Sequence, residues 1–205
     1  MRLKILPFLL IIFLMISNNI LSAADGSIQA DLDTLINIVV ASDGSGDYTT
    51  VTEGINAVPD NSTSRTVLFI KKGVYREKVY VPASKKNLTM VGEHVDSTII
   101  VYDDYAGRIV NGVELNTFTS QTIQIDPDDF RAMNITFSND ARPDGTGDGQ
   151  NVAVNSKGKR QVYLHCRFIA WQDTYYTGSD GRHYFKDCFI EGAVDYIFGH
   201  TTTIF

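Results

Sequence analysis

The 205-residue sequence contains only two cysteines, one tryptophan and five prolines, and its 18 basic residues are outnumbered by 24 acidic ones. Two cysteines are too few for a disulfide scaffold or a four-thiolate zinc site. The net charge of −6 argues against general nucleic-acid binding, which requires a basic face. With 43% hydrophobic and 20% charged residues, the chain is also unlike disordered, collagen-like, coiled-coil or polytopic membrane proteins. We expect one globular domain, or part of a larger one.

The first 24 residues have the pattern of a secretory signal peptide. Two basic residues, Arg2 and Lys4, precede an apolar run of 12 residues at positions 5–16, and Ser22-Ala23-Ala24 supplies small residues for cleavage. Twelve residues are short for a membrane span, so an uncleaved anchor is the weaker alternative. We therefore expect an exported mature chain of residues 25–205 that is not held in a membrane. Loss of Arg2 and Lys4 would take its net charge from −6 to −8.

The pattern of apolar residues predicts one short helix followed by many short strands. Val51, Ile55 and Val58 recur at helical spacing, Thr50 and Glu53 form a capping box, and Pro59 ends the segment. Short segments rich in β-branched and aromatic residues then alternate with Gly, Asn and Asp. No amphipathic helices alternate with these strands, which argues against a doubly wound α/β sheet. The predicted strands are Thr66–Lys71, Leu88–Val91, Thr98–Tyr102, Thr122–Ile125, Ile135–Phe137, Val162–Ile169 and Tyr184–Ile190.

Equal spacings in the second half predict stacked coils of about 20 residues each. Three pairs, Gln150 with Gln172, Asp173 with Asp195, and Cys166 with Cys188, are each separated by 22 residues. In a parallel solenoid such pairs lie one rung apart, about 4.8 Å. The two cysteines could then bridge neighbouring coils. Chance agreement of three spacings in a strand-rich chain is the alternative.

Two carboxyl groups one rung apart suit acid–base and nucleophilic chemistry. At about 5 Å, Coulomb repulsion between Asp173 and Asp195 amounts to roughly 3 kcal/mol, or about two pKa units. We expect one carboxyl to keep its proton at neutral pH and the other to be ionised, as a general acid and a nucleophile require. Gln150 and Gln172 would offer N–H donors to an oxyanion, which favours acyl chemistry. A purely structural ladder of Asp and Gln side chains is the alternative.

Four motifs follow one another along the chain. They are Gly73-Val74-Tyr75-Arg76-Glu77-Lys78-Val79, Gln150-Asn151-Val152-Ala153-Val154, Trp171-Gln172-Asp173-Thr174 and Val194-Asp195-Tyr196-Ile197-Phe198-Gly199. In this order they resemble the motifs of the pectin methylesterase (pectinesterase) family, and the likeness runs from about residue 38 to residue 205. The segment at residues 43–50 is also similar to the start of the family's sequences. The family fold is a right-handed parallel β-helix, an all-β solenoid, which agrees with the predicted stacked coils and leaves room for the short N-terminal helix.

The resemblance implies a role for each matched residue in the hydrolysis of methylated pectin. Asp195 matches the nucleophile and Asp173 the general acid and base. Gln150 matches the main oxyanion donor, with Gln172 assisting, and Thr117 matches a threonine that contacts substrate.

Other residues are matched less specifically. Trp171, Tyr176 and Phe198 could line the groove that binds the sugar rings, with core packing as the alternative for each. Cys166 and Cys188 match a disulfide present in some family members. Neither a metal nor another cofactor is expected.

The sequence also departs from the family pattern. The family's Leu-Gly-Arg-Pro-Trp segment does not occur before Phe205, so we expect residues 25–205 to be the N-terminal portion of a truncated catalytic domain. Asn151 stands where the family usually has Ala. The expected protein is a monomer in the extracellular space or cell wall, or in the periplasm or on the cell surface of a bacterium. Its expected partner is methylated homogalacturonan. A noncatalytic pectin-binding solenoid, an inactive fragment without the family arginine, and a polygalacturonase or lyase are the alternatives.

Overall fold

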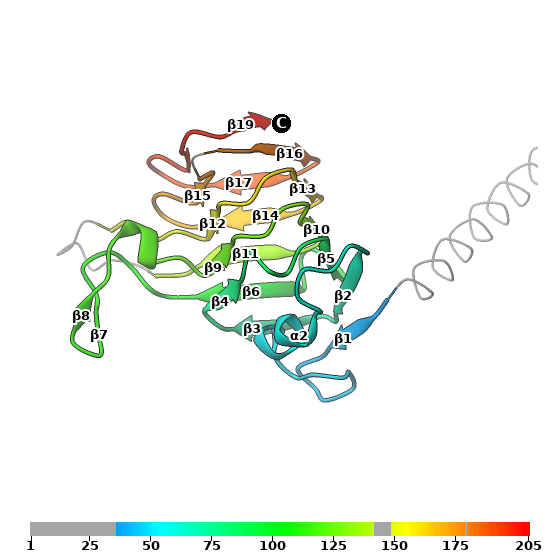
Figure 1. Ribbon diagram of the computed structural model, residues 1–205. Coiled ribbons are helices and arrows are strands. Elements are labelled where there is room, and N and C mark those ends of the chain that lie inside the picture. The colour runs from blue at the N-terminus through cyan, green and yellow to red at the C-terminus, as the bar shows by residue number, and fades with distance from the viewer. Residues whose placement is uncertain (1–35, 142–148, 179) are drawn as a thin grey trace, which may run out of the picture. The chain divides into compact units, whose positions relative to one another are not determined.

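The structure is a computed structural model that describes residues 36–205 except 142–148 and 179 (Figure 1). The expected signal peptide, residues 1–24, lies outside the described residues. The strands form three parallel sheets, which we call sheets A, B and C, with seven, five and five strands. Each coil of the chain crosses sheet A, then sheet B, then sheet C, and the next coil stacks on it, as in β2–β3–β4 and β13–β14–β15. The fold is therefore a parallel β-helix, as the sequence predicts.

The strands are short, two to five residues each. Sheet A contains β1 (Ile38–Val40), β2 (Thr66–Ile70), β5 (Leu88–Gly92), β10 (Arg131–Met133), β13 (Gln161–Leu164), β16 (Arg182–Lys186) and β19 (Thr202–Ile204). Sheet B contains β3 (Gly73–Arg76), β6 (Thr98–Tyr102), β11 (Thr136–Asn139), β14 (Arg167–Ile169) and β17 (Phe189–Glu191). Sheet C contains β4 (Val79–Val81), β9 (Ile123–Ile125), β12 (Val154–Ser156), β15 (Tyr175–Tyr176) and β18 (Ile197–Phe198).

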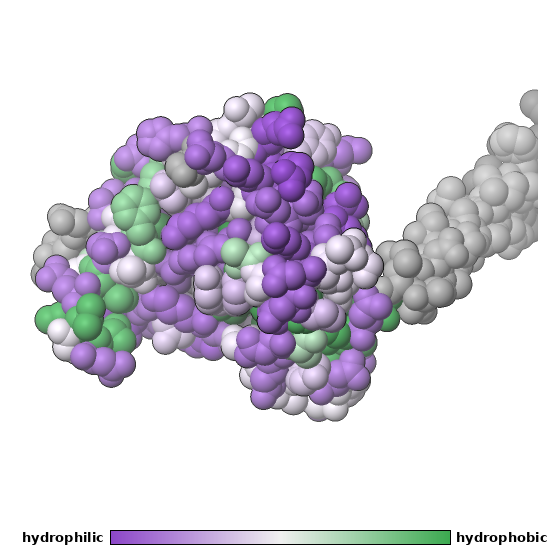
Figure 2. Space-filling model, in the orientation of Figure 1, coloured by the Kyte–Doolittle hydropathy of each residue, from purple (hydrophilic) through white to green (hydrophobic). Residues whose placement is uncertain are grey.

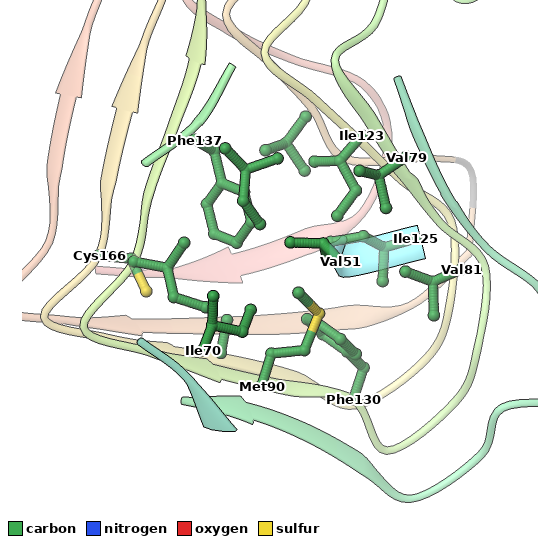
Figure 3. Close-up of a cluster of buried hydrophobic side chains, with 14 of the residues drawn as sticks. Val51, Ile70, Val79, Val81, Met90, Ile123, Ile125, Phe130, Phe137 and Cys166 are labelled. Carbon is green, nitrogen blue, oxygen red and sulfur yellow. The ribbon is translucent and has the colours of Figure 1, made fainter. Parts of the chain in front are cut away.

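The hydrophobic core fills the inside of the coils. Alternation along a strand turns every second side chain inward, as the buried and half-buried residues of β2 show. Figure 3 shows inward side chains from several strands, including Ile70, Met90, Ile123 and Phe137, meeting in one cluster. Identical positions in successive coils therefore stack, and this stacking holds the outward-facing loops in a fixed register.

Residues with positive φ turn the chain from sheet A to sheet B. Asn134, His165 and Asp187 have φ values of 55°, 49° and 53°, respectively, and occupy the same corner in three successive coils. Each corner separates a strand of sheet A from one of sheet B. Two predicted strands, Val162–Ile169 and Tyr184–Ile190, were therefore too long, because each contains such a corner and is really a pair of strands.

The α-helix α2 (Val51–Ala57) closes the N-terminal end of the core. Thr50 and Glu53 form the predicted capping box, and the helix buries Val51 and Ile55. The carboxylate of Glu77 accepts the N–H groups of Val51 and Thr52, which adds a negative charge at the helix N-terminus. Among the described residues, no helix has the length and apolarity needed to cross a membrane.

A hairpin and a short 3-10 helix project beside sheet C. The antiparallel strands β7 (Ile109–Val110) and β8 (Val113–Glu114) form the hairpin, and η1 (Thr117–Thr119) follows it. Figure 2 shows hydrophobic residues gathered at the hairpin, where Ile109 and Val113 are 71% and 65% exposed. The 3-10 helix returns the chain to β9 and places Phe118 over the outer side of sheet C.

Candidate active site

Asp173 and Asp195 occupy equivalent positions in neighbouring coils. Gln172 and Val194 form a parallel bridge, and the backbone N–H of Asp173 donates to the carbonyl of Val194 at 3.0 Å. Both aspartates adopt positive φ, 63° and 47°. Short polar side chains tolerate this left-handed conformation better than most residues. The sequence spacing therefore predicts correctly that these two residues lie one rung apart.

The two carboxyl groups differ in their surroundings. Asp173 is only 6% exposed and its Oδ1 has no hydrogen-bond partner among the described residues, whereas Asp195 is exposed. Burial, followed by the charge of Asp195, raises the pKa of Asp173 to about 6. The predicted direction is confirmed, but burial is the larger cause. With a pKa of about 6, Asp173 titrates below pH 7, so the prediction that one carboxyl keeps its proton at neutral pH is met only in part.

The two predicted glutamines lie opposite each other in neighbouring coils, with Gln172 directly before Asp173. The N–H of Asn151 donates to the carbonyl of Gln172 at 3.1 Å, which pairs Asn151 with Asp173 and sets Gln150 opposite Gln172. Both glutamines are half-buried. Two successive N–H groups, those of Ala153 and Val154, then donate to the single carbonyl of Thr174. This bulge absorbs one residue and changes the inter-coil offset from 22 to 21 just past the site.

A row of aromatic side chains lies on the outer side of sheet C, beside the aspartates. The ring centroid of Tyr176 lies 5.0 Å from that of Phe118 and 4.9 Å from that of Phe198. Trp171 is 61% exposed. The alternative of core packing is therefore wrong for Trp171, and Tyr176 and Phe198 are only partly buried. Thr117 is half-buried at the start of the 3-10 helix that carries Phe118.

The two cysteines are adjacent, but they are thiols in the described structure. Cys166 pairs with Cys188 across β14 and β17, and the N–H of Cys166 points to the Cys188 Sγ at 3.4 Å. The Cys166 thiol donates to the carbonyl of Leu164, and the Cys188 thiol lies 3.4 Å from the carbonyl of Tyr163. The predicted adjacency is correct. The disulfide that the family resemblance implies is not formed here, since both cysteines are free.

Two features of the site were not predicted from the sequence. Phe118 had no assigned role, although its ring extends the aromatic row. Asn151 was noted only as a departure from the family pattern, yet it is fully buried and its side-chain oxygen accepts the N–H of Gln172 at 2.9 Å. The only signal for this contact in the sequence is that a polar residue, Asn151, directly follows Gln150.

Comparison with known proteins gives one consistent family. The family model described as Pectinesterase matches residues 37–205. A pectinesterase from Daucus carota is 42% identical over 168 residues, which covers 82% of this chain and 50% of the relative. Pectinesterase 31 from Arabidopsis thaliana is 40% identical over 170 residues, which covers 80% of this chain and 52% of the relative. The chain thus spans about half the length of these curated relatives.

Solved structures give the same result. A pectin methylesterase from carrot superposes with a TM-score of 0.72 at 40% identity, covering 82% of this chain and 50% of that one. The pectin methylesterase PemA from Erwinia chrysanthemi superposes with a TM-score of 0.75 at 32% identity, covering 82% of this chain and 53% of that one. A further pectin methylesterase structure, with a TM-score of 0.74 at 32% identity and the same coverage, contains a bound hexasaccharide.

Proposed function

This chain belongs to the pectinesterase family, and on that premise we propose that it hydrolyses the methyl esters of pectin with Asp195 as nucleophile. The observation that carries the proposal is a buried, protonatable Asp173 one rung from an exposed Asp195, with Gln172 directly before Asp173 and Gln150 opposite Gln172 in the preceding coil. An acyl transfer needs a nucleophile, a proton donor and an oxyanion site at one carbonyl, and these four side chains can supply all three.

In the first step, the carboxylate of Asp195 attacks the carbonyl carbon of a methyl galacturonate. The negative charge that develops on the carbonyl oxygen is stabilised by the side-chain N–H groups of Gln150 and Gln172. The bond to the methoxy oxygen then breaks, and Asp173 donates its proton to that oxygen, so methanol leaves. The products are an anhydride between Asp195 and the galacturonyl group, and an ionised Asp173.

In the second step, water hydrolyses the anhydride. Asp173 accepts a proton from water, and the resulting hydroxide attacks the galacturonyl carbonyl. The bond to Asp195 breaks, which returns its carboxylate, leaves Asp173 protonated and releases a free galacturonic acid unit. A pKa of about 6 suits a group that must give and take a proton in turn.

The exposed aromatic row supports a polysaccharide substrate. Tyr176, Phe198 and Phe118 offer ring faces and edges beside the aspartates, and sugar rings pack well on such surfaces. We include Trp171 and Thr117 in the proposed substrate site because both lie at its edge and neither is buried in the core. We also propose that the chain acts outside the cytoplasm, as a monomer, after removal of residues 1–24.

Methanol release from methylated pectin, with the Asp195→Ala variant as the comparison, tests the proposal. We expect release by the parent protein and a loss of at least about 1,000-fold in Asp195→Ala, because the variant lacks the carboxylate that forms the anhydride. Glu191→Gln is the matched control, since Glu191 is also an exposed acid of the same coil. Binding of pectin without any methanol release would instead support a noncatalytic pectin-binding solenoid, and equal activity in Asp195→Ala would refute the mechanism.

A further inference from the structure

Two buried asparagines form a network directly behind the candidate oxyanion site. Asn139 and Asn151 are 3% and 0% exposed. The Asn151 Nδ2 donates to the backbone carbonyl of Ala141 at 3.1 Å and to the backbone and side-chain oxygens of Asn139 at 3.3 and 3.4 Å. A buried amide that is satisfied this fully has little freedom to move.

Asn139 anchors this network to three other parts of the chain. Its Nδ2 lies 2.9 to 3.1 Å from the carbonyls of Asp104, Ser120 and Val152, and its Oδ1 accepts the N–H of Ala141 at 3.0 Å. The pair therefore joins the loops that follow β6, η1 and β11 to the start of β12. A displacement of any one of these loops would break hydrogen bonds to the same two side chains.

The network reaches the candidate site through Gln172. The Asn151 Oδ1 accepts the N–H of Gln172 at 2.9 Å, and the Asn151 N–H donates to the carbonyl of Gln172 at 3.1 Å. One residue thus holds the peptide groups on both sides of the Gln172 Cα. Because both peptide planes are fixed, the direction in which the Gln172 side chain leaves the backbone is also fixed.

We infer that Asn151 is a positioning residue that sets the Gln172 amide for oxyanion stabilisation. The inference rests on the proposed function and deepens it. Asn151 does not touch the substrate carbonyl; it acts through Gln172, and Asn139 and Ala141 hold it in place. An alanine at this position, as the family pattern has it, could make the backbone hydrogen bond but not the one from the side-chain oxygen, so in this chain the support of Gln172 depends on the asparagine.

Hydrogen exchange and kinetics of Asn151→Ala test the inference together. We expect the backbone amide of Gln172 to exchange about tenfold faster, because it loses its acceptor. We expect kcat for methanol release to fall about 10-fold with KM changed less than about twofold, since the lost interaction acts in the transition state. In a Gln172→Ala background, Asn151→Ala should lower kcat no further.

Gln161→Ala is the matched control. Gln161 is a buried amide of the next coil, 1% exposed, whose side-chain oxygen accepts the hydroxyl of Tyr163 and whose amide N–H donates to the carbonyl of Pro127. We expect it to lower the thermal midpoint as Asn151→Ala does, without faster exchange at Gln172. If Asn151→Ala does not fold, Asn151→Ser, whose hydroxyl is too short to replace the amide, is used with the same expectations.

The outcomes separate this inference from the proposed function. Absence of methanol release by the parent protein contradicts the proposed function. An active parent in which Asn151→Ala leaves the exchange of Gln172 unchanged contradicts only the positioning role. The inference is also overturned if the fold-losses in kcat of Asn151→Ala and Gln172→Ala multiply in the double variant. In that case Asn151 affects activity independently of Gln172, as a purely structural residue would.

Discussion

The backbone amide of Asp173 donates to the carbonyl of Val194, so Asp173 and Asp195 stand side by side in the stack, with the first buried and the second exposed. Equivalent positions in a repeating fold would otherwise have equivalent surroundings. Among the described residues, the segment of Asp173 is bonded to a coil on each side, since the Gln172 carbonyl accepts the N–H of Asn151 and the Asp173 N–H donates to the carbonyl of Val194. Two carboxyl groups of one residue type thereby acquire different tendencies to hold a proton.

The charge of Asp195 contributes to the high pKa of Asp173, and Asp195→Asn should reveal how much. We expect the pKa of Asp173 to fall from about 6 but to remain above the ordinary 3.8, because burial is the larger cause of the shift. Carbon-13 NMR titration of the aspartate carboxyl groups measures it. Glu191→Gln, which removes a different exposed charge, should leave the midpoint at about 6. An unchanged midpoint in Asp195→Asn would show that the two carboxyl groups do not interact.

Much of this architecture could be predicted from the sequence, because its main signals are local or periodic. The helix followed from the Thr50 and Glu53 capping box and the spacing of Val51 and Ile55. The stacked coils followed from the repeated 22-residue spacings, and the pairing of Asp173 with Asp195 came from the same spacing.

Other features depend on tertiary contacts that no local pattern encodes. Strands of two residues, such as β15, are too short for alternation to be recognised, and no Gly or Pro marks the corners at His165 and Asp187. The bulge at Ala153 and Val154 depends on hydrogen bonds to the next coil. The burial of Asp173, which decides its pKa, depends on which loops cover it and could not be derived from spacing.

Tyr176 stands at the centre of the aromatic row, so Tyr176→Ala should weaken substrate binding. We expect KM for methylated pectin to rise about 5- to 10-fold with little change in kcat, which corresponds to about 1–1.5 kcal/mol of lost ring contact. Initial rates of methanol release over a range of pectin concentrations measure both constants. Tyr184→Ala is the control, because Tyr184 is an exposed tyrosine of sheet A, on a different face. A fall in kcat at constant KM would contradict a binding role for Tyr176.

The two adjacent thiols should differ sharply in reactivity. Hydrogen bonding with Cys166 lowers the pKa of Cys188 to about 7, whereas burial raises the pKa of Cys166. We expect iodoacetamide to modify Cys188 of the reduced protein with a pH midpoint near 7 and to spare Cys166, as read by peptide mass spectrometry. Cys166→Ala removes the neighbouring thiol and should move the midpoint upward. Modification of neither cysteine before a reductant is added would mean that the disulfide predicted from the family resemblance has formed.

The buried His183 should make the fold sensitive to acid. Its ring is 2% exposed and lies between the hydroxyl of Tyr175 at 3.1 Å and the carbonyl of Gly158 at 3.1 Å. Burial lowers its pKa below the ordinary 6.5. The unfolded chain therefore takes up the proton first as the pH falls, so the stability contributed by neutral His183 is present above pH 6.5 and is lost progressively below it.

His183→Gln should remove this part of the pH dependence. We expect the urea midpoint of the parent protein to fall more between pH 7.5 and pH 5 than that of His183→Gln, with both proteins losing some stability through their acidic groups. His94→Gln is the control, since His94 is 64% exposed and should behave as the parent does. Identical falls in the parent and in His183→Gln would mean that the buried ring is protonated as easily in the folded protein as in the unfolded chain.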